Sequence, residues 1–159
     1  MVYSLQTHGA LLRRLIDHLD GAVEQAYADA GLDYRPRFTP ILRALLNNGP
    51  ASLRVLSEHT GVTHSAVSQT ITQMSARRWV SLEAGTDARE RIVALTPFAM
   101  QHLPRLEQCW DATEAASRSL DEDLGGPFSD TLIRALEALE RRPLADRIAT
   151  ASSPNSGVE

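Results

Sequence analysis

Residues 52–96 read SLRVLSEHTGVTHSAVSQTITQMSARRWVSLEAGTDARERIVALT, and this stretch decides the fold. Apolar side chains recur in its first half at the spacing of two short helices that each bury one face. They are Leu53, Leu56, Val62, Val67, Ile71 and Met74. Gly61 permits the positive φ of a turn, and Ser52 and Thr63 have hydroxyls that can cap helix N-termini. The pattern therefore predicts a helix, a turn and a second helix.

The outward side chains of the second helix are small, neutral and able to hydrogen bond. Solvated helix faces usually pair Glu with Lys or Arg four residues apart, and none of these occurs between His64 and Ala76. Such side chains can enter the major groove of DNA and contact base edges. The candidate DNA-contacting residues here are Thr63, His64, Ser65, Ser68, Gln69, Thr72, Gln73, Arg77 and Arg78. The alternative is the polar surface of an ordinary helix pair.

The second half of the stretch predicts a β-hairpin. WVSLEA and RIVAL are rich in β-branched and aromatic residues, and GTDARE separates them. Asp87 and Arg89 lie in the expected tip, with Arg91 just behind it. An arginine on a hairpin tip can enter the minor groove, and a nearby carboxylate can hold another arginine at a fixed angle. The alternative is a charged, solvated turn.

These strings resemble the MarR family of winged helix-turn-helix transcriptional regulators. GVTHSAVSQTI resembles the family's recognition helix and TDARERIVALT its hairpin, called the wing. The resemblance extends over residues 4–145 and implies a mainly α fold with a small β-hairpin wing. By this resemblance, the base- or phosphate-contacting positions are Ser65, Ser68, Gln69 and Gln73, and the wing-tip positions are Asp87 and Arg89.

The chain departs from the family pattern within and just after the recognition helix. Members often carry Arg where Gln69 and Gln73 stand, so we expect a gentler salt dependence of DNA binding. Many members have Gly where Arg78 stands. An arginine there loses the easy left-handed helix cap but adds a cation beside Arg77.

We predict a winged helix-turn-helix head with N- and C-terminal dimerisation helices. The expected parts are an N-terminal dimerisation helix (1–33), the head (34–97), C-terminal dimerisation helices (98–145) and a disordered tail (146–159). Amphipathic patterns predict the helices 4–31, 39–47, 97–120 and 128–142. In the last helix, the apolar residues Phe128, Leu132, Ile133, Leu136 and Leu139 are expected to be buried.

The long helix predicted from residue 97 needs a partner surface. About 24 helical residues span roughly 36 Å, too long for one small head to cover. In the resembling family, two chains interlock into a homodimer, which implies a pseudo-palindromic operator. The alternative is a monomer whose helices pack back on their own chain.

Charge is divided unevenly along the sequence, although the net charge is −4. Residues 35–91 carry eight arginines and four acidic residues, a net charge of +4. Residues 1–34 and 92–159 have net charges of −3 and −5. The positive charge therefore coincides with the stretch expected to contact DNA.

Several other classes of protein are disfavoured. No segment is apolar enough to span a membrane and no signal-peptide layout is present, which predicts a cytoplasmic protein. Cys109 is the single cysteine, so intrachain disulfides and cysteine zinc modules are excluded, and a small core side chain is its expected role. The five histidines form no HExxH motif, and no phosphate-binding glycine loop occurs. We therefore expect no enzyme activity, no metal site and no cofactor.

The segment DYRPRFTP joins the first helix to the head and is a candidate effector site. The resembling family often binds small aromatic or anionic molecules near this junction. Tyr34, Arg35, Arg37 and Phe38 could provide aromatic walls and a guanidinium clamp for a carboxylate or phenolate. The alternative is that Phe38 belongs to the core and both arginines are solvated.

Together, these observations predict a sequence-specific regulator that binds double-stranded DNA as a homodimer. We expect a repressor relieved by a small ligand. The alternative is a winged-helix protein-interaction module without specific DNA binding.

Overall fold

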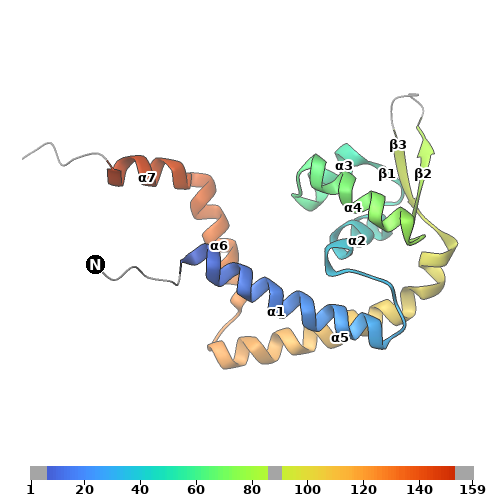
Figure 1. Cartoon of the computed structure of the whole chain (residues 1–159), viewed down its shortest axis with the longest axis horizontal. Coiled ribbons are helices and arrows are strands. Elements are labelled where there is room, and N and C mark those ends of the chain that lie inside the picture. The colour runs from blue at the N-terminus through green and yellow to red at the C-terminus, as the bar shows by residue number, and fades with distance from the viewer. Residues whose placement is uncertain (1–6, 86–90, 153–159) are drawn as a thin grey trace, which may run out of the picture. The chain divides into compact units, whose positions relative to one another are not determined.

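The computed structural model describes residues 7–85 and 91–152 (Figure 1). The chain forms two compact units, Met1–Ala112 and Thr113–Glu159. The first unit contains α1 (His8–Asp29), a 3-10 helix η1 (Pro36–Phe38), α2 (Thr39–Asn48), β1 (Ala51–Ser52), α3 (Leu53–Thr60), α4 (His64–Ala76), β2 (Val80–Ala84), β3 (Arg91–Leu95) and the start of α5 (Pro97–Leu124). The second unit contains the rest of α5, α6 (Phe128–Arg141) and α7 (Leu144–Ser152).

The core of the first unit joins the helix-turn-helix to the linker that follows α1. Its buried apolar residues are Tyr27, Leu32, Tyr34, Phe38, Ile41, Leu42, Leu45, Leu56, Val67, Ile71, Met74, Trp79, Val80, Val93, Ala99, Leu106 and Cys109. Aromatic rings pack edge to face through it, with centroid distances of 4.8 Å for Tyr34 and Trp79 and 5.4 Å for Tyr34 and Phe38. The indole N–H of Trp79 donates to the carbonyl of Asp33 at 2.9 Å. The linker is thus fixed to the base of the hairpin.

The wing is a three-stranded antiparallel sheet in the order β1-β3-β2. Strand β2 pairs with β3 in the register Val80↔Leu95 and Leu82↔Val93, as expected for the predicted hairpin. Strand β1 pairs with β3 through Ala51↔Val93 and was not predicted. A two-residue strand is too short to show alternating polarity, so only its partner reveals it.

The predicted fold class, mainly α with a small β-hairpin wing, is confirmed. The predicted caps are also present. Ser52 accepts a hydrogen bond from Val55 N at 3.4 Å, and Thr63 accepts one from Ala66 N at 3.3 Å. Gly61 ends α3 with φ +66°, the left-handed conformation expected for the turn.

The prediction of a disordered tail from residue 146 is wrong for its first residues, because α7 continues to Ser152. The Arg147 guanidinium donates to the carbonyls of Arg142 at 3.1 Å and Ala138 at 3.0 Å, which secures α7 to the end of α6. The remainder of that tail, 153–159, lies outside the described residues, as do residues 4–6 of the predicted first helix.

The α6 stripe, expected to be buried, is exposed within the single chain. Among the described residues, α6 has no buried side chain, and Leu136 is 63% exposed and Ile133 52%. The other members of the stripe are exposed or, for Phe128, half-buried. The second unit supplies no layer of side chains that covers this face. An amphipathic pattern predicts that a face is apolar, but not which surface covers it.

Candidate nucleic-acid interface

The helix-turn-helix presents one face of α4 to solvent. The opposite face is anchored in the core by Val67, Ile71 and Met74, each at most 2% exposed. The Ser57 hydroxyl donates to the Val62 carbonyl at 2.6 Å across the turn, which helps to fix the approach of α4. The described face therefore has a defined orientation within its unit.

Most of the predicted base-reading residues share that exposed face. His64, Ser65, Gln69 and Thr72 are exposed, and Ser68 is half-buried beside them. The Thr72 hydroxyl donates to the Ser68 carbonyl at 3.0 Å, while the side chains of His64, Ser65 and Gln69 make no hydrogen bond to any described residue. Thr63 is exposed but its hydroxyl caps the helix. The face thus offers uncommitted donors and acceptors.

Gln73 and Arg77, two predicted DNA-contacting residues, bond instead to the linker after α1. Arg37 donates through Nη2 to Oε1 of Gln73. Arg77 forms an ion pair with Asp33 at 2.9 Å and donates to the Gln73 carbonyl at 3.3 Å. Gln73 and Arg77 are half-buried, so the last turn of α4 is attached to the linker by side-chain bonds.

Arg78 occupies the position where the resembling family often has glycine, and its backbone has the left-handed φ of +64°. Its guanidinium lies over the Phe98 ring at 4.4 Å from the centroid, and the residue is exposed. Arg91 is exposed at the start of β3. Asp87 and Arg89, the predicted wing-tip residues, lie outside the described residues.

The expected aromatic walls of the effector site are absent. Tyr34 is 3% exposed and Phe38 0%, and both belong to the core. For Phe38, this is the alternative considered from the sequence. An edge-to-face packed ring is committed to its neighbours and offers no open surface to a ligand. Arg35 is held by Glu24 at 2.8 Å rather than fully solvated.

A polar cavity of about 410 Å³ nevertheless opens beside the linker. It is lined by Asp20, Glu24, Arg35, Pro36, Arg37, Gln73 and Arg77. Burial raises the pKa of Asp20 above its usual range, with a further contribution from the charges of Glu24 and Asp17, while Arg37 opposes the rise. Sequence reasoning missed Asp20 and Glu24, because only the packing of α1 beside the linker brings them to the arginines.

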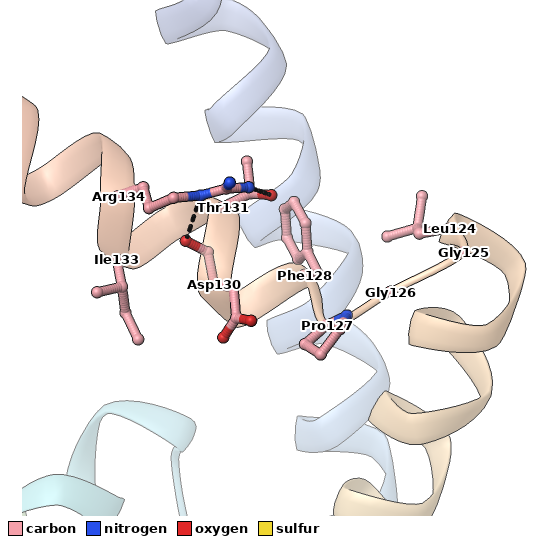
Figure 2. A pocket seen from close by; sticks show the side chains of 9 residues that line it. All are labelled: Leu124, Gly125, Gly126, Pro127, Phe128, Asp130, Thr131, Ile133 and Arg134. Carbon is pink, nitrogen blue, oxygen red and sulfur yellow. Dashed lines mark hydrogen bonds between the residues drawn. The ribbon is translucent and has the colours of Figure 1, made fainter.

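A second cavity, of about 670 Å³, lies at the turn between α5 and α6. Figure 2 shows it lined by the side chains of Leu124, Phe128 and Ile133 beside Asp130, Thr131 and Arg134. Arg134 donates to the Asp130 carbonyl and the Thr131 hydroxyl, each at 3.3 Å (Figure 2). Its apolar wall continues the exposed stripe of α6.

Cys109 is a core residue, as predicted, and is 8% exposed. Its thiol lies 3.8 Å from the Ala26 carbonyl, and burial raises its pKa. A raised pKa disfavours the reactive thiolate. Within 7–85 and 91–152, no group of His, Cys, Asp and Glu residues has the arrangement of a metal site.

Taken together, α3, α4 and the β2–β3 hairpin form a winged helix-turn-helix. The model of the MarR family matches residues 36–90, the part of the chain that contains α2, α3, α4 and β2. The resemblance inferred from the recognition helix and wing strings is thereby confirmed. No helix of the described residues is both long and apolar enough to cross a membrane.

Solved structures of regulators share the fold. The M. tuberculosis transcriptional regulator MosR, solved in complex with DNA, matches with a TM-score of 0.69 and 21% identity over 87% of this chain and 100% of its own. The PcaV transcriptional regulator from Streptomyces coelicolor, solved with its natural ligand, matches with a TM-score of 0.66 and 20% identity over 87% and 98%.

A third match is BpsR of Bordetella bronchiseptica, whose DNA binding is regulated by 6-hydroxynicotinic acid. The TM-score is 0.59, with 21% identity over 87% of this chain and 99% of BpsR. No curated protein sequence matches the chain significantly.

Proposed function

We propose that this protein is a transcriptional regulator that recognises a specific sequence in double-stranded DNA. The observation that carries the proposal is the exposed face of α4, where His64, Ser65 and Gln69 have no hydrogen-bond partner among the described residues. Placed in a major groove, these groups would meet the donors and acceptors of base edges. The match of residues 36–90 to the model of the MarR family supports the same function.

The surrounding charges suit contact with the phosphate backbone. Arg78 and Arg91 are exposed near the ends of the hairpin, and Arg54 is exposed on α3. Positive side chains that flank a base-reading helix supply affinity and position the protein on the duplex. In this proposal Arg89 enters the minor groove from the wing, and Asp87 holds a neighbouring arginine.

The proposed active form is a homodimer. Exposed apolar side chains on α1 and α6 support it, because contiguous exposed apolar faces commonly mark an interaction surface. On α1, Leu12 is 47% exposed and Ile16 54%, and on α6 Leu136 is 63% exposed. A two-fold dimer has two recognition helices and would bind a pseudo-palindromic operator.

The proposed regulatory mode is repression relieved by a small effector. The polar cavity beside the linker supports it, since Gln73 and Arg77 of the recognition helix line that cavity. A ligand there would compete for the side-chain bonds that hold the end of α4. A ligand shifts DNA affinity only if it binds the two conformations unequally.

A protein-interaction module without specific DNA binding is the second candidate. The exposed apolar stripe of α6 favours it, because a surface of this kind can bind a different protein as well as a second copy. The two candidates differ in what α4 does: only the regulator needs Gln69 at a base edge.

Binding selection from genomic fragments, with the purified whole protein, separates them. We expect wild type to enrich a short inverted repeat, and Gln69→Ala to weaken binding to it by about 5- to 150-fold, the effect of losing one good base contact of about 1–3 kcal/mol. Gln101→Ala removes an exposed glutamine of α5 and is the matched control, with unchanged binding. Weak, salt-labile binding without sequence preference would instead favour the interaction module.

A further inference from the structure

The cavity beside the linker contains two charged side chains that form no ion pair among the described residues. Three of its lining residues are ion-paired: Arg35 and Glu24 with each other at 2.8 Å, and Arg77 with Asp33 at 2.9 Å. Two others, Arg37 and Asp20, form no ion pair with any residue in the described parts of the chain. Arg37 and Asp20, both exposed to solvent, are therefore a cation and a carboxylate of the same cavity that form no ion pair among the described residues.

Arg37 has only a neutral partner. Its guanidinium donates to the side-chain amide oxygen of Gln73. A carboxylate carries the opposite charge to a guanidinium and can accept two parallel hydrogen bonds from it, which a single amide oxygen cannot. A ligand carboxylate would therefore displace Gln73 from Arg37.

Asp20 is a carboxylate that forms no ion pair with a cation among the described residues. Partial burial and the nearby charges of Glu24 and Asp17 raise its pKa, and Arg37 opposes this rise too weakly to reverse it. A cationic group placed beside Asp20 would stabilise the ionised carboxylate. No lysine occurs anywhere in the chain, and no arginine of the described residues forms an ion pair with Asp20.

The lining of this cavity favours a polar ligand over an aromatic ring. Pro36 is the one apolar residue in it, and Tyr34 and Phe38 are turned into the core. Two carboxylates, Asp20 and Glu24, would repel a dianion. The chemistry that fits is small and polar, with one positive and one negative group.

We propose that this cavity binds a small zwitterion of the amino-acid class, whose carboxylate is held by Arg37 and whose ammonium group is held by Asp20. Binding breaks the hydrogen bond between Arg37 and Gln73 and so releases the last turn of α4 from the linker. Binding of the ligand by Arg37 and Asp20 does not require DNA. Its effect on DNA binding rests on the proposed function above, and we expect the ligand to weaken DNA binding at least tenfold.

The test uses calorimetric titration and thermal unfolding of the whole protein. The probes are the twenty protein amino acids, β-alanine and γ-aminobutyrate, followed by the deaminated and decarboxylated analogues of the tightest binder. At about 100 times its Kd, that binder should raise Tm by roughly 5 °C. Each analogue should bind at least tenfold more weakly, because one of its two charges is missing.

Variants assign the contacts. Asp20→Asn and Arg37→Gln should each lower the affinity at least tenfold. Asp20→Asn should bind the deaminated analogue at least as tightly as wild type does, because it removes a repelling carboxylate. Gln73→Ala should bind at least as tightly as wild type, because Arg37 then has no competing acceptor. Asp29→Asn is the matched control: it removes an α1 carboxylate that bonds Gln25 outside the cavity, and should bind normally.

The outcomes separate this inference from the proposed function. Absence of binding by every probe, or equal binding by Asp20→Asn and wild type, overturns the inference. Weaker ligand binding by Gln73→Ala than by wild type overturns the idea that the ligand carboxylate and Gln73 compete for Arg37. Amino-acid binding by a protein that selects no DNA sequence refutes only the proposed regulator.

Discussion

At the scale of single residues, the strained position is Arg78. Its φ of +64° costs a side chain with a Cβ about 1–2 kcal/mol relative to the right-handed conformation. The stacking of its guanidinium on Phe98 returns only about 0.5–1 kcal/mol at an exposed site. The backbone cost therefore exceeds the stacking, so stability alone does not account for an arginine here.

Two variants separate backbone from side chain at this position. We expect Arg78→Gly to be more stable than Arg78→Ala by about 1–2 kcal/mol in urea unfolding, because both lose the stacking but only glycine relieves the strain. Both should reduce the salt dependence of DNA binding by about one counterion if Arg78 contacts a phosphate. Equal stabilities of the two variants would contradict the left-handed conformation.

Tyr34 is a second residue that lowers folding stability, because its hydroxyl is buried. Its oxygen and that of Thr39 have no hydrogen-bond partner among the described residues. Burial raises the pKa of Tyr34 above its usual range, although the nearby Thr39 hydroxyl opposes the rise. The folded chain therefore holds this proton more tightly than the unfolded chain does.

The sign of the pH dependence follows. Because the folded pKa is the higher one, Tyr34 contributes full stability below the ordinary tyrosine pKa of about 10 and loses it as pH rises beyond that value. We expect Tyr34→Phe to be as stable as wild type or about 1 kcal/mol more stable at pH 7. Its unfolding free energy should also fall less between pH 9 and 11. An identical fall in both proteins would show that the phenol is not buried.

At the scale of elements, the position of the recognition helix depends on its first turn. The Thr63 hydroxyl accepts from Ala66 N at 3.3 Å, and no acidic residue in the first turn adds to it. A lost N-cap of this kind costs about 1 kcal/mol. The cost falls on the turn that presents His64 and Ser65.

We therefore expect Thr63→Ala to lower the unfolding free energy by about 1 kcal/mol and to weaken DNA binding. Thr63→Ser keeps a capping hydroxyl and is the control, with both properties near wild type. Hydrogen exchange should show faster exchange confined to the first turn of α4 in the alanine variant. A serine variant as unstable as the alanine variant would exclude the capping role.

At the scale of the whole molecule, exposed leucine and isoleucine side chains are the dominant feature. The stripe of α6 has no buried member among the described residues, and Leu136 is its most exposed residue. Covering such side chains gains about 25 cal/mol for each Å² removed from water. A partner that covers the stripe would obtain this gain.

Leu136→Asp places a charge in the centre of that stripe. We expect the variant to remain helical and to sediment as a monomer at concentrations where wild type is a dimer, because a buried unpaired carboxylate opposes association. Leu82→Asp changes an apolar residue of the wing, 38% exposed, and should sediment as wild type does. A wild-type monomer, or a dimeric Leu136→Asp, would contradict the proposed interface.

The sequence by itself determined the local elements of this protein. Caps, turn glycine and helical periodicity act between neighbours in the chain, so Ser52, Gly61 and Thr63 specified the helix-turn-helix, and the apolar positions specified its buried face. The hairpin strands were evident from their β-branched runs. The residues of α4 outside this buried face were therefore expected to be exposed to solvent.

Only the tertiary structure decided which distant groups meet. Asp20 lies on α1 and Gln73 on α4, and no local pattern relates them to Arg37, yet all three line one cavity. Likewise, the sequence does not say whether Tyr34 and Phe38 face a ligand or the core. In the structure both are core residues: Tyr34 packs against Trp79, and Phe38 packs against Tyr34. Side-chain pairing across elements depends on how the helices pack, and a one-dimensional pattern does not contain that information.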